Sequence, residues 1–281
     1  MKNAFKEEKY FFLMSPALVW QLCFFFLSLI LVVQLAFFEQ PFQNFTYEYL
    51  EQVLRVSHFL VIFRSVKLAT VTAFLCLLFG YPVASYLALY VDRRYKSMLL
   101  FLITLPFLTN LLVQIYAWYF ILEKNGALNK IITLFVPEVG NWLNGSFAMY
   151  LVTFHIYLPF MVMPLYTILE KINPRLIEAS LDLGGSYKQT FFRVVLPLSI
   201  QGIKTGFFLV YVTTFGEYVI PSLLGGQKHF FVGTLISEYF FIGRDWHVGA
   251  AFTCLSSCVF IISIIFFNYI LQKIILRLQR I

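Results

Sequence analysis

The chain has 281 residues, of which 60% are hydrophobic and only 12% are charged, with a net charge of +7 and a mean hydropathy of +0.80. Soluble domains carry about 25% charged residues, so this composition excludes an ordinary soluble domain and indicates an integral membrane protein. The basic excess does not indicate nucleic-acid binding, because Lys and Arg flank the apolar runs instead of gathering on one solvated face.

Six apolar runs divide the sequence, and each is long enough to cross a hydrocarbon core, which needs about 20 helical residues. The runs cover about residues 11–38, 60–91, 97–122, 146–169, 200–224 and 248–272. The first run is too long for the core of a signal peptide, and no small-residue cleavage site follows it. We therefore predict an all-α integral membrane protein with six transmembrane helices, a single transmembrane domain over 1–281 whose core bundle covers about 60–272.

Lys and Arg are distributed unevenly between the two sides of these spans, and this bias sets the orientation of a membrane protein. Fourteen of them lie on the side that holds both termini, and five lie on the other side. Arg64 and Lys67 fall near one end of the second run, where long side chains can extend to the interface. We therefore predict that both termini are cytoplasmic.

The longest cytoplasmic loop, residues 171–199, begins with the signals of a short helix. Asn173 is a favourable N-cap, and Pro174 suits the first helical position. Gly184 and Gly185 can end this helix, since glycine readily adopts the left-handed conformation that often follows a helix C-terminus. The loop is therefore predicted to start with a helix that stops at a glycine turn.

A second helix is predicted directly after the glycines. Ser186 can cap it, and the segment YKQTFFRVVL then leads to Pro197, where we expect the helix to end. On the first helix Glu178 and Asp182 lie on one face, so the loop is a short amphipathic hairpin. Such a hairpin can insert into a groove of another protein, or it can pack back on its own bundle.

The loop resembles the cytoplasmic signature of binding-protein-dependent ABC importer permeases. In that signature Glu-Ala-Ala is followed after three residues by Gly, and after nine more by Ile, any residue, Leu and Pro. The matching positions, with every spacing kept, are Glu178, Ala179, Ser180, Gly184, Val194, Leu196 and Pro197. Ser for the second Ala and Val for Ile are departures that keep the small and β-branched character. The resemblance implies a type I ABC importer permease bundle with a cytoplasmic coupling-helix hairpin.

In that family the hairpin docks on the ATP-hydrolysing subunit. Carried over by position, Glu178 would contact the ATPase, Ala179 and Ser180 would allow close approach, and Gly184 would form the turn. The expected partners are a second homologous permease subunit, two ATPase subunits and a periplasmic binding protein. This chain would catalyse no covalent reaction and bind no cofactor or metal, because it has no GxxxxGK[ST] loop, HExxH or CxxC sequence; ATP and Mg²⁺ would be bound by the ATPase.

Other segments resemble the spermidine/putrescine importers, specifically their B-type permease subunits. They are GYPVASYLA (80–88), LPFLTNLLVQIYAW (105–118), YLPFMVMPLYTILEKINPRLIEASLDLGGS (157–186) and RDWHVGAA (244–251), and the similarity extends from about 60 to 255. The resemblance implies polyamine import through the bacterial inner membrane, with a periplasmic polyamine-binding protein as partner. Iron, thiamine and other permeases have parts of these segments in common, so another small solute is the alternative cargo.

A polycation pathway should contain carboxylates and aromatic rings, and ionisable residues within a membrane are costly enough to be functional candidates. Glu217 is the only carboxylate deep in a predicted span. We interpret it as a cation site, the alternative being a structural carboxylate that is hydrogen-bonded to a neighbouring helix. Tyr211 and Tyr218 lie near it in sequence.

Three further features bear on the pathway. Trp118 can line its outer end or belong to the aromatic belt at the membrane interface. Asp245 can guide a cation on the outer side or be part of a solvated loop. Arg64 and Lys67 would repel a polyamine if they lined the pathway, so polyamine transport requires them to face lipid headgroups or a partner helix.

Two other functional classes fit the sequence less well. An ion-coupled secondary transporter would need no ATPase, but such proteins usually contain internal repeats and intramembrane ion sites, and no repeat is evident here. A membrane-embedded enzyme would need a catalytic cluster, and the sequence contains none that we recognise. The sequence therefore favours a permease.

Overall fold

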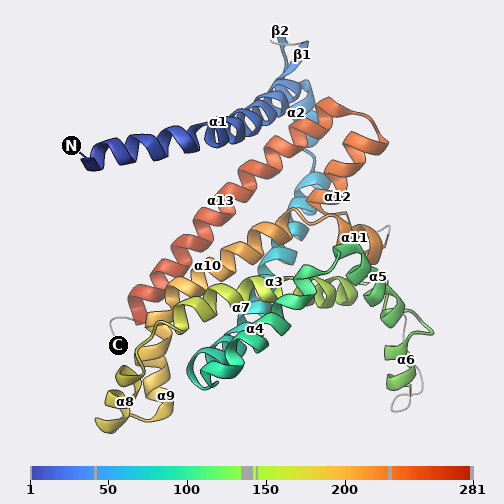
Figure 1. The fold of residues 1–281 in the computed structure, drawn as a ribbon. Helices are drawn as coiled ribbons and strands as arrows, with labels where there is room; N and C mark the ends of the chain where they lie inside the picture. The colour runs from blue at the N-terminus through green and yellow to red at the C-terminus, as the bar shows by residue number, and fades with distance from the viewer. Residues whose placement is uncertain (1, 41–42, 134–141, 144, 227–229, 279–281) are drawn as a thin grey trace. The chain divides into compact units, whose positions relative to one another are not determined.

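The computed structural model describes residues 2–40, 43–133, 142–143, 145–226 and 230–278 (Figure 1). Side chains are described from residue 14 onward, apart from residues 40, 131–132 and 274–278. The chain forms two compact units, one made of Met1–Phe59 and Ile236–Cys258, the other of Leu60–Leu235 and Val259–Ile281. Each is described by itself.

The first unit contains a long apolar helix followed by a short strand pair. The strands are antiparallel, with Phe38 opposite Phe45, so the described chain is helical apart from this small addition to the predicted all-α fold. The elements of this unit are α1 (Lys2–Phe37), β1 (Phe38–Gln40), β2 (Gln43–Phe45), α2 (Glu48–Val53), the π-helix η2 (Glu238–Ile242) and the first part of α13 (Trp246–Leu278).

The second unit is a helical bundle with a helical hairpin. Its helices up to the hairpin are α3 (Val56–Leu89, of which residues 56–59 belong to the first unit), α4 (Arg93–Leu108), α5 (Leu111–Leu122), α6 (Ala127–Ile132) and α7 (Ser146–Leu169). The hairpin and the elements after it are α8 (Pro174–Asp182), α9 (Tyr187–Thr190), the π-helix η1 (Phe191–Val195), α10 (Leu196–Phe215), α11 (Val219–Leu224) and α12 (Val232–Ser237), followed by the rest of α13.

The predicted spans are confirmed in number when a bent helix pair is included. Among the described residues, five helices are long and apolar enough to cross a membrane, and a sixth candidate is the pair Arg93–Leu108 and Leu111–Lys130, bent by 89°. Two predicted runs need correction. The run 97–122 contains this bend, and the run 200–224 belongs to a helix that starts at Tyr187 and stops at Phe215.

The bend between α4 and α5 is stabilised by polar side chains at the break. The Asn110 side chain accepts hydrogen bonds from the backbone N–H groups of Leu112 and Val113 at the start of α5. The Gln114 amide donates to the carbonyl of Pro106 and to the Thr109 hydroxyl. These bonds satisfy backbone groups that would be costly in a membrane, where no water replaces a missing partner.

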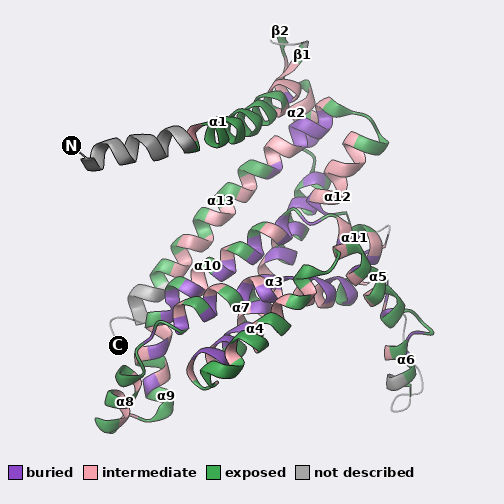
Figure 2. Ribbon diagram, in the orientation of Figure 1, coloured by how far each residue is buried: buried purple, intermediate pink, exposed green. Residues whose placement is uncertain are grey.

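Two glycines bring α7 and α10 into close contact in the second unit. A Cβ atom on Gly202 would lie 3.1 Å from both the Cα of Leu165 and the carbonyl oxygen of Pro164, and one on Gly206 would lie 2.6 Å from the Met161 sulfur. The facing side chains of Met161 and Leu165 are fully buried, and Figure 2 shows the buried residues gathered along these two helices. Small residues at this spacing allow the close approach on which helix association in membranes depends.

Replacing Gly202 with leucine should therefore force α7 and α10 apart. We expect Gly202→Leu to lower the free energy of unfolding by about 3 kcal/mol, at the upper end of the usual cost of overpacking, measured by thermal denaturation of the purified protein in detergent. Gly216→Leu is the control, because a Cβ at Gly216 meets nothing within 4 Å. Equal melting temperatures for the two variants would contradict the role given to Gly202.

Candidate functional site

The cytoplasmic hairpin begins as its sequence predicts. The Asn173 side chain accepts a hydrogen bond from the Arg175 N–H at 3.1 Å, and Pro174 occupies the first turn of α8. After α8 the backbone turns at Gly184, whose φ of +84° favours glycine. A side chain on Gly185 would place its Cβ 2.6 Å from the Ser180 carbonyl oxygen. The two glycines are thus required for different reasons, one for conformation and the other for space.

The second arm of the hairpin is capped as predicted but does not end where predicted. Ser186 and Gln189 form a capping box at the start of α9. The expected end at Pro197 is wrong, because the chain continues as one helix from Tyr187 to Phe215. The two arms are joined by the hydroxyls of Ser180 and Thr190, 2.9 Å apart.

The hairpin carries two unlike surfaces. One is a groove of about 410 Å³ between its arms, lined by Leu176, Ala179, Ser180, Leu183, Gly185, Gln189, Arg193 and Val194. The other is the face of α8 that carries Glu178 and Asp182, both exposed and, among the described residues, not in an ion pair. Apolar side chains are unusually open here, with Leu183 89% and Tyr187 76% exposed (Figure 2). A surface of this kind is typical of a contact with another protein.

Glu217 lies at a break between α10 and α11 and is only 7% exposed. One of its carboxylate oxygens accepts hydrogen bonds from the backbone N–H groups of Tyr218, Val219 and Ile220. The other accepts a hydrogen bond from the Tyr157 hydroxyl. The carboxylate therefore caps α11 and joins it to α7, which are the contacts expected of the structural alternative for this residue.

Tyr157 is the twelfth of the 24 residues of α7. At 1.5 Å per residue α7 is about 36 Å long, so Glu217 meets α7 about halfway along its length. Irregular backbone near the middle of a span is tolerated where it is buried in protein or lines a cavity. The break at Glu217 therefore lies near the middle of the bundle, with its carboxylate buried.

The other candidate pathway residues have separate partners. Tyr218 is 46% exposed beside Glu217, whereas Tyr211 is fully buried and donates a hydrogen bond to the Ser263 hydroxyl at 2.7 Å. Trp118 contacts the His155 ring edge to face, with centroids 5.3 Å apart. Asp245 belongs to the first unit, where its carboxylate accepts a hydrogen bond from the N–H of Val248 in the first turn of α13. Among the contacts of the described residues, none joins Glu217 to Tyr211 or Trp118.

Arg64 and Lys67 are exposed on α3. Between them Ser65 is buried, and its hydroxyl oxygen accepts a hydrogen bond from the Val232 N–H at 2.8 Å. Within the part of the chain that the structure describes, neither cation pairs with a carboxylate. Their side chains therefore face the surroundings of this unit and not its core.

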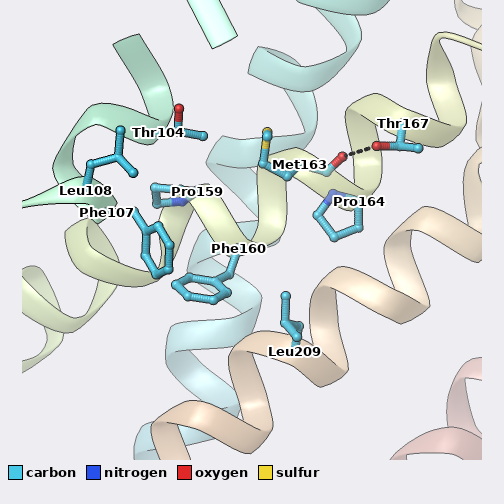
Figure 3. A pocket seen from close by; sticks show the side chains of 9 residues that line it. All are labelled: Thr104, Phe107, Leu108, Pro159, Phe160, Met163, Pro164, Thr167 and Leu209. Atoms are coloured by element: carbon cyan, nitrogen blue, oxygen red, sulfur yellow. Dashed lines mark hydrogen bonds between the residues drawn. The ribbon is translucent and has the colours of Figure 1, made fainter. Parts of the chain in front are cut away.

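An apolar cavity of about 540 Å³ lies between α4, α7 and α10 (Figure 3). Its lining consists of Thr104, Phe107, Leu108, Pro159, Phe160, Met163, Pro164, Thr167 and Leu209. The two hydroxyls are already used, since Thr104 donates to the carbonyl of Leu100 and Thr167 to that of Met163. This cavity offers no charge and suits an apolar group, so it does not suit a polycation.

Comparison with known proteins identifies the family. The family model for the binding-protein-dependent transport system inner membrane component matches residues 80–279. The chain belongs to this family. It is a multi-pass membrane protein and a permease subunit of an ABC importer, a transport component and not an enzyme.

The permease is similar to several curated relatives. It is 37% identical over 221 residues to the spermidine/putrescine transport system permease protein PotB of Haemophilus influenzae, covering 77% of this chain and 76% of that protein. For PotB of Escherichia coli K12 the identity is 37% over 210 residues, covering 74% and 76%. For the inner membrane ABC transporter permease protein YdcU of the same organism it is 34%, covering 69% and 66%.

Two solved structures have the same fold. One is a bacterial ABC transporter involved in the import of the acidic polysaccharide alginate, with a TM-score of 0.70, 19% identity and coverage of 97% of this chain and 99% of that chain. The other is a bacterial alginate ABC transporter in complex with a pentasaccharide-bound periplasmic protein, with a TM-score of 0.67, 18% identity and coverage of 98% and 97%. These matches support the type I importer bundle predicted from the loop.

The sequence indicated Glu217 but not its partner. Tyr157 lies 60 residues earlier and was not singled out, because nothing local links the two residues. The same holds for Thr190, which bonds Ser180 across the hairpin. Gly185 did carry a signal, since glycine is the usual residue where backbone must approach closely.

The hydrogen bonds of Glu217 predict a clear difference between two substitutions. Glu217→Ala leaves three backbone N–H groups and the Tyr157 hydroxyl without acceptors, so we expect a loss of at least about 3 kcal/mol in the free energy of unfolding. Glu217→Gln keeps an acceptor for the N–H groups and should cost about 1 kcal/mol or less. Thermal denaturation in detergent checks this, and equally stable variants would show that the carboxylate is not a cap.

Proposed function

We propose that this permease imports polyamines, spermidine and putrescine, into the cytoplasm. The support for this cargo is its similarity to the spermidine/putrescine permeases, at 37% identity over about three quarters of the chain. The alternative is another small solute, such as thiamine or iron, carried by the same kind of bundle.

The proposed assembly pairs this chain with a second homologous permease, two ATPase subunits and a periplasmic polyamine-binding protein. ATP and Mg²⁺ would be bound by the ATPase subunits, and this chain would bind no cofactor of its own. In the bacterial inner membrane the hairpin and both termini would face the cytoplasm, in agreement with the excess of Lys and Arg on that side. The family description, which names a binding protein, supports a periplasmic partner.

The continuity of one helix supports the proposed mechanism most directly. From Tyr187 in the hairpin one helix, which includes a π turn at Phe191–Val195, runs to Phe215, directly before the break at Glu217. When the ATPase subunits close on ATP, a docked hairpin would be displaced, and this helix would carry the displacement to the middle of the bundle. Glu178 would contact the ATPase, and the small side chains of Ala179 and Ser180 would let its surface approach the groove.

The proposed pathway passes the break at Glu217. Among the described residues, its carboxylate accepts hydrogen bonds from neutral donors and forms no ion pair, so no cationic side chain there competes with a cationic substrate. Tyr218 offers an exposed ring beside it, and polyamines bind aromatic faces and carboxylates. Arg64 and Lys67 would face lipid headgroups or the partner permease, which fits their exposure on α3.

The cargo can be tested by uptake of radiolabelled spermidine and putrescine into vesicles that contain the reconstituted complex. We expect ATP-dependent uptake by the wild type. We also expect Glu217→Gln to raise KM for spermidine about tenfold, the effect of losing about 1.4 kcal/mol of binding, because the amide keeps the cap but not the charge. If neither polyamine is taken up and thiamine or iron stimulates the ATPase instead, the polyamine cargo is wrong, whereas the assignment as a permease stands.

The hairpin can be tested by reversing the charge of Glu178. We expect Glu178→Arg to abolish both co-purification of the ATPase subunits and uptake. A surface that accepts the Glu178 carboxylate would meet a positive charge instead, and like charges placed together at an interface cost several kcal/mol. Glu51→Arg is the matched control, as Glu51 is also exposed but lies on α2 in the other unit. Retained ATPase binding by Glu178→Arg would exclude Glu178 from the contact.

A further inference from the structure

The base of the hairpin contains a π-helical turn, η1, at Phe191–Val195. Pro197 explains it, because a proline has no N–H for the carbonyl four residues earlier and its ring collides with that carbonyl. In this chain the carbonyl belongs to Arg193, inside η1. The wider turn relieves the collision, and the Leu196 N–H bonds the Phe191 carbonyl five residues back. The proline that closes the signature thus widens the helix without ending it.

Tyr81 of α3 contacts the start of this π turn and a residue beyond its end. Its ring lies edge to face on Phe191, with centroids 5.6 Å apart and an interplanar angle of 86°. Its hydroxyl lies 2.8 Å from the Ser199 hydroxyl, in a buried contact. Ser199 donates its own proton to the Leu196 carbonyl, so Tyr81 is the donor to Ser199. One side chain therefore connects α3 to the first residue of the irregular segment and to a residue beyond it.

The π turn separates a fixed part of the helix from a projecting part. Beyond it, Gly202 and Gly206 hold α10 closely against α7. Before it, the hairpin tip is open, as the exposure of Leu183 and Tyr187 shows. Irregular helical turns of this kind often occur at functional sites and hinges. Any movement of the hairpin relative to the bundle would therefore be concentrated at η1, next to Tyr81.

We propose that Tyr81 is the positioning residue that couples the hairpin to α3 by holding the π turn in one geometry. This inference depends on the proposed docking of the hairpin to an ATPase. With the hydroxyl present, a displaced hairpin moves α10 and α3 together. Without it, the π turn absorbs the displacement, so that ATP is still hydrolysed but less substrate is moved.

The first test measures ATP hydrolysed per spermidine transported in the reconstituted complex. We expect Tyr81→Phe to bind the ATPase and hydrolyse ATP as the wild type does, with uptake lowered about fivefold, the lower end of typical coupling between sites. Ser199→Ala should have the same effect, and the double variant should be no worse than either single one, since all three remove one interaction.

Tyr239→Phe is the matched control. Its hydroxyl also makes a 2.8 Å contact with a side chain, His58, but in the other unit. We expect its ratio of ATP hydrolysed to spermidine transported to equal that of the wild type. A ratio in Tyr81→Phe that equals that of this control would overturn the proposal, because a purely structural tyrosine would alter stability without changing the ratio.

The second test does not depend on the cargo. Hydrogen–deuterium exchange of the intact complex should become faster at residues 191–199 in Tyr81→Phe and Ser199→Ala, and stay unchanged there in Tyr239→Phe. Unchanged exchange in Tyr81→Phe would also overturn the proposal. A wild-type complex that takes up no spermidine would contradict the proposed cargo alone, and the exchange rates would then decide the role of Tyr81.

Discussion

A chain that leaves the helical path inside a membrane must bond its own free N–H and C=O groups, because lipid offers them no partner. Three departures from regular helix in the described part of the bundle each have a polar side chain nearby. Asn110 caps the helix after the bend between α4 and α5. Glu217 caps the helix after the break that follows α10. Ser199, bonded by Tyr81, lies four residues past the end of the π turn. The few polar residues within these apolar spans therefore stabilise the places where the helices are irregular.

How much of this could be predicted follows from the range of each interaction. The caps at Asn173 and Ser186 depend on neighbours two or three residues away, so the hairpin was predictable in detail up to its second arm. The apolar runs were predictable because the hydropathy of a span depends only on its own consecutive residues. The continuation of the helix through Pro197 was not predictable. A proline can either end a helix or be accommodated by a π turn, and the choice depends on how the surrounding residues pack. The bond from Tyr157 to Glu217 joins positions 60 apart, and no local pattern encodes it.

Two cavities in the described part of the second unit differ in chemistry, and the difference bears on function. The groove of the hairpin mixes apolar side chains with Arg193 and Gln189, as surfaces that meet another protein commonly do. The cavity between α4, α7 and α10 has hydroxyls that are bonded to their own helices and offers only apolar surface. Size alone would favour the larger cavity as the substrate site. Its chemistry instead suits lipid or an apolar helix, and among the described residues of the bundle the buried carboxylate is Glu217.

The glycines between α7 and α10 have a mechanical consequence. Backbone contacts at van der Waals distance leave almost no compliance between two helices, since close-packed interiors are hard to compress and transmit strain. The two helices therefore form one rigid unit. Within it α10 continues from the hairpin, and α7 carries Tyr157 at its midpoint. A displacement that passes the π turn and reaches α10 would therefore be carried to the Glu217 break by both helices together. Two residues without side chains, Gly202 and Gly206, thus determine that α7 and α10 move together.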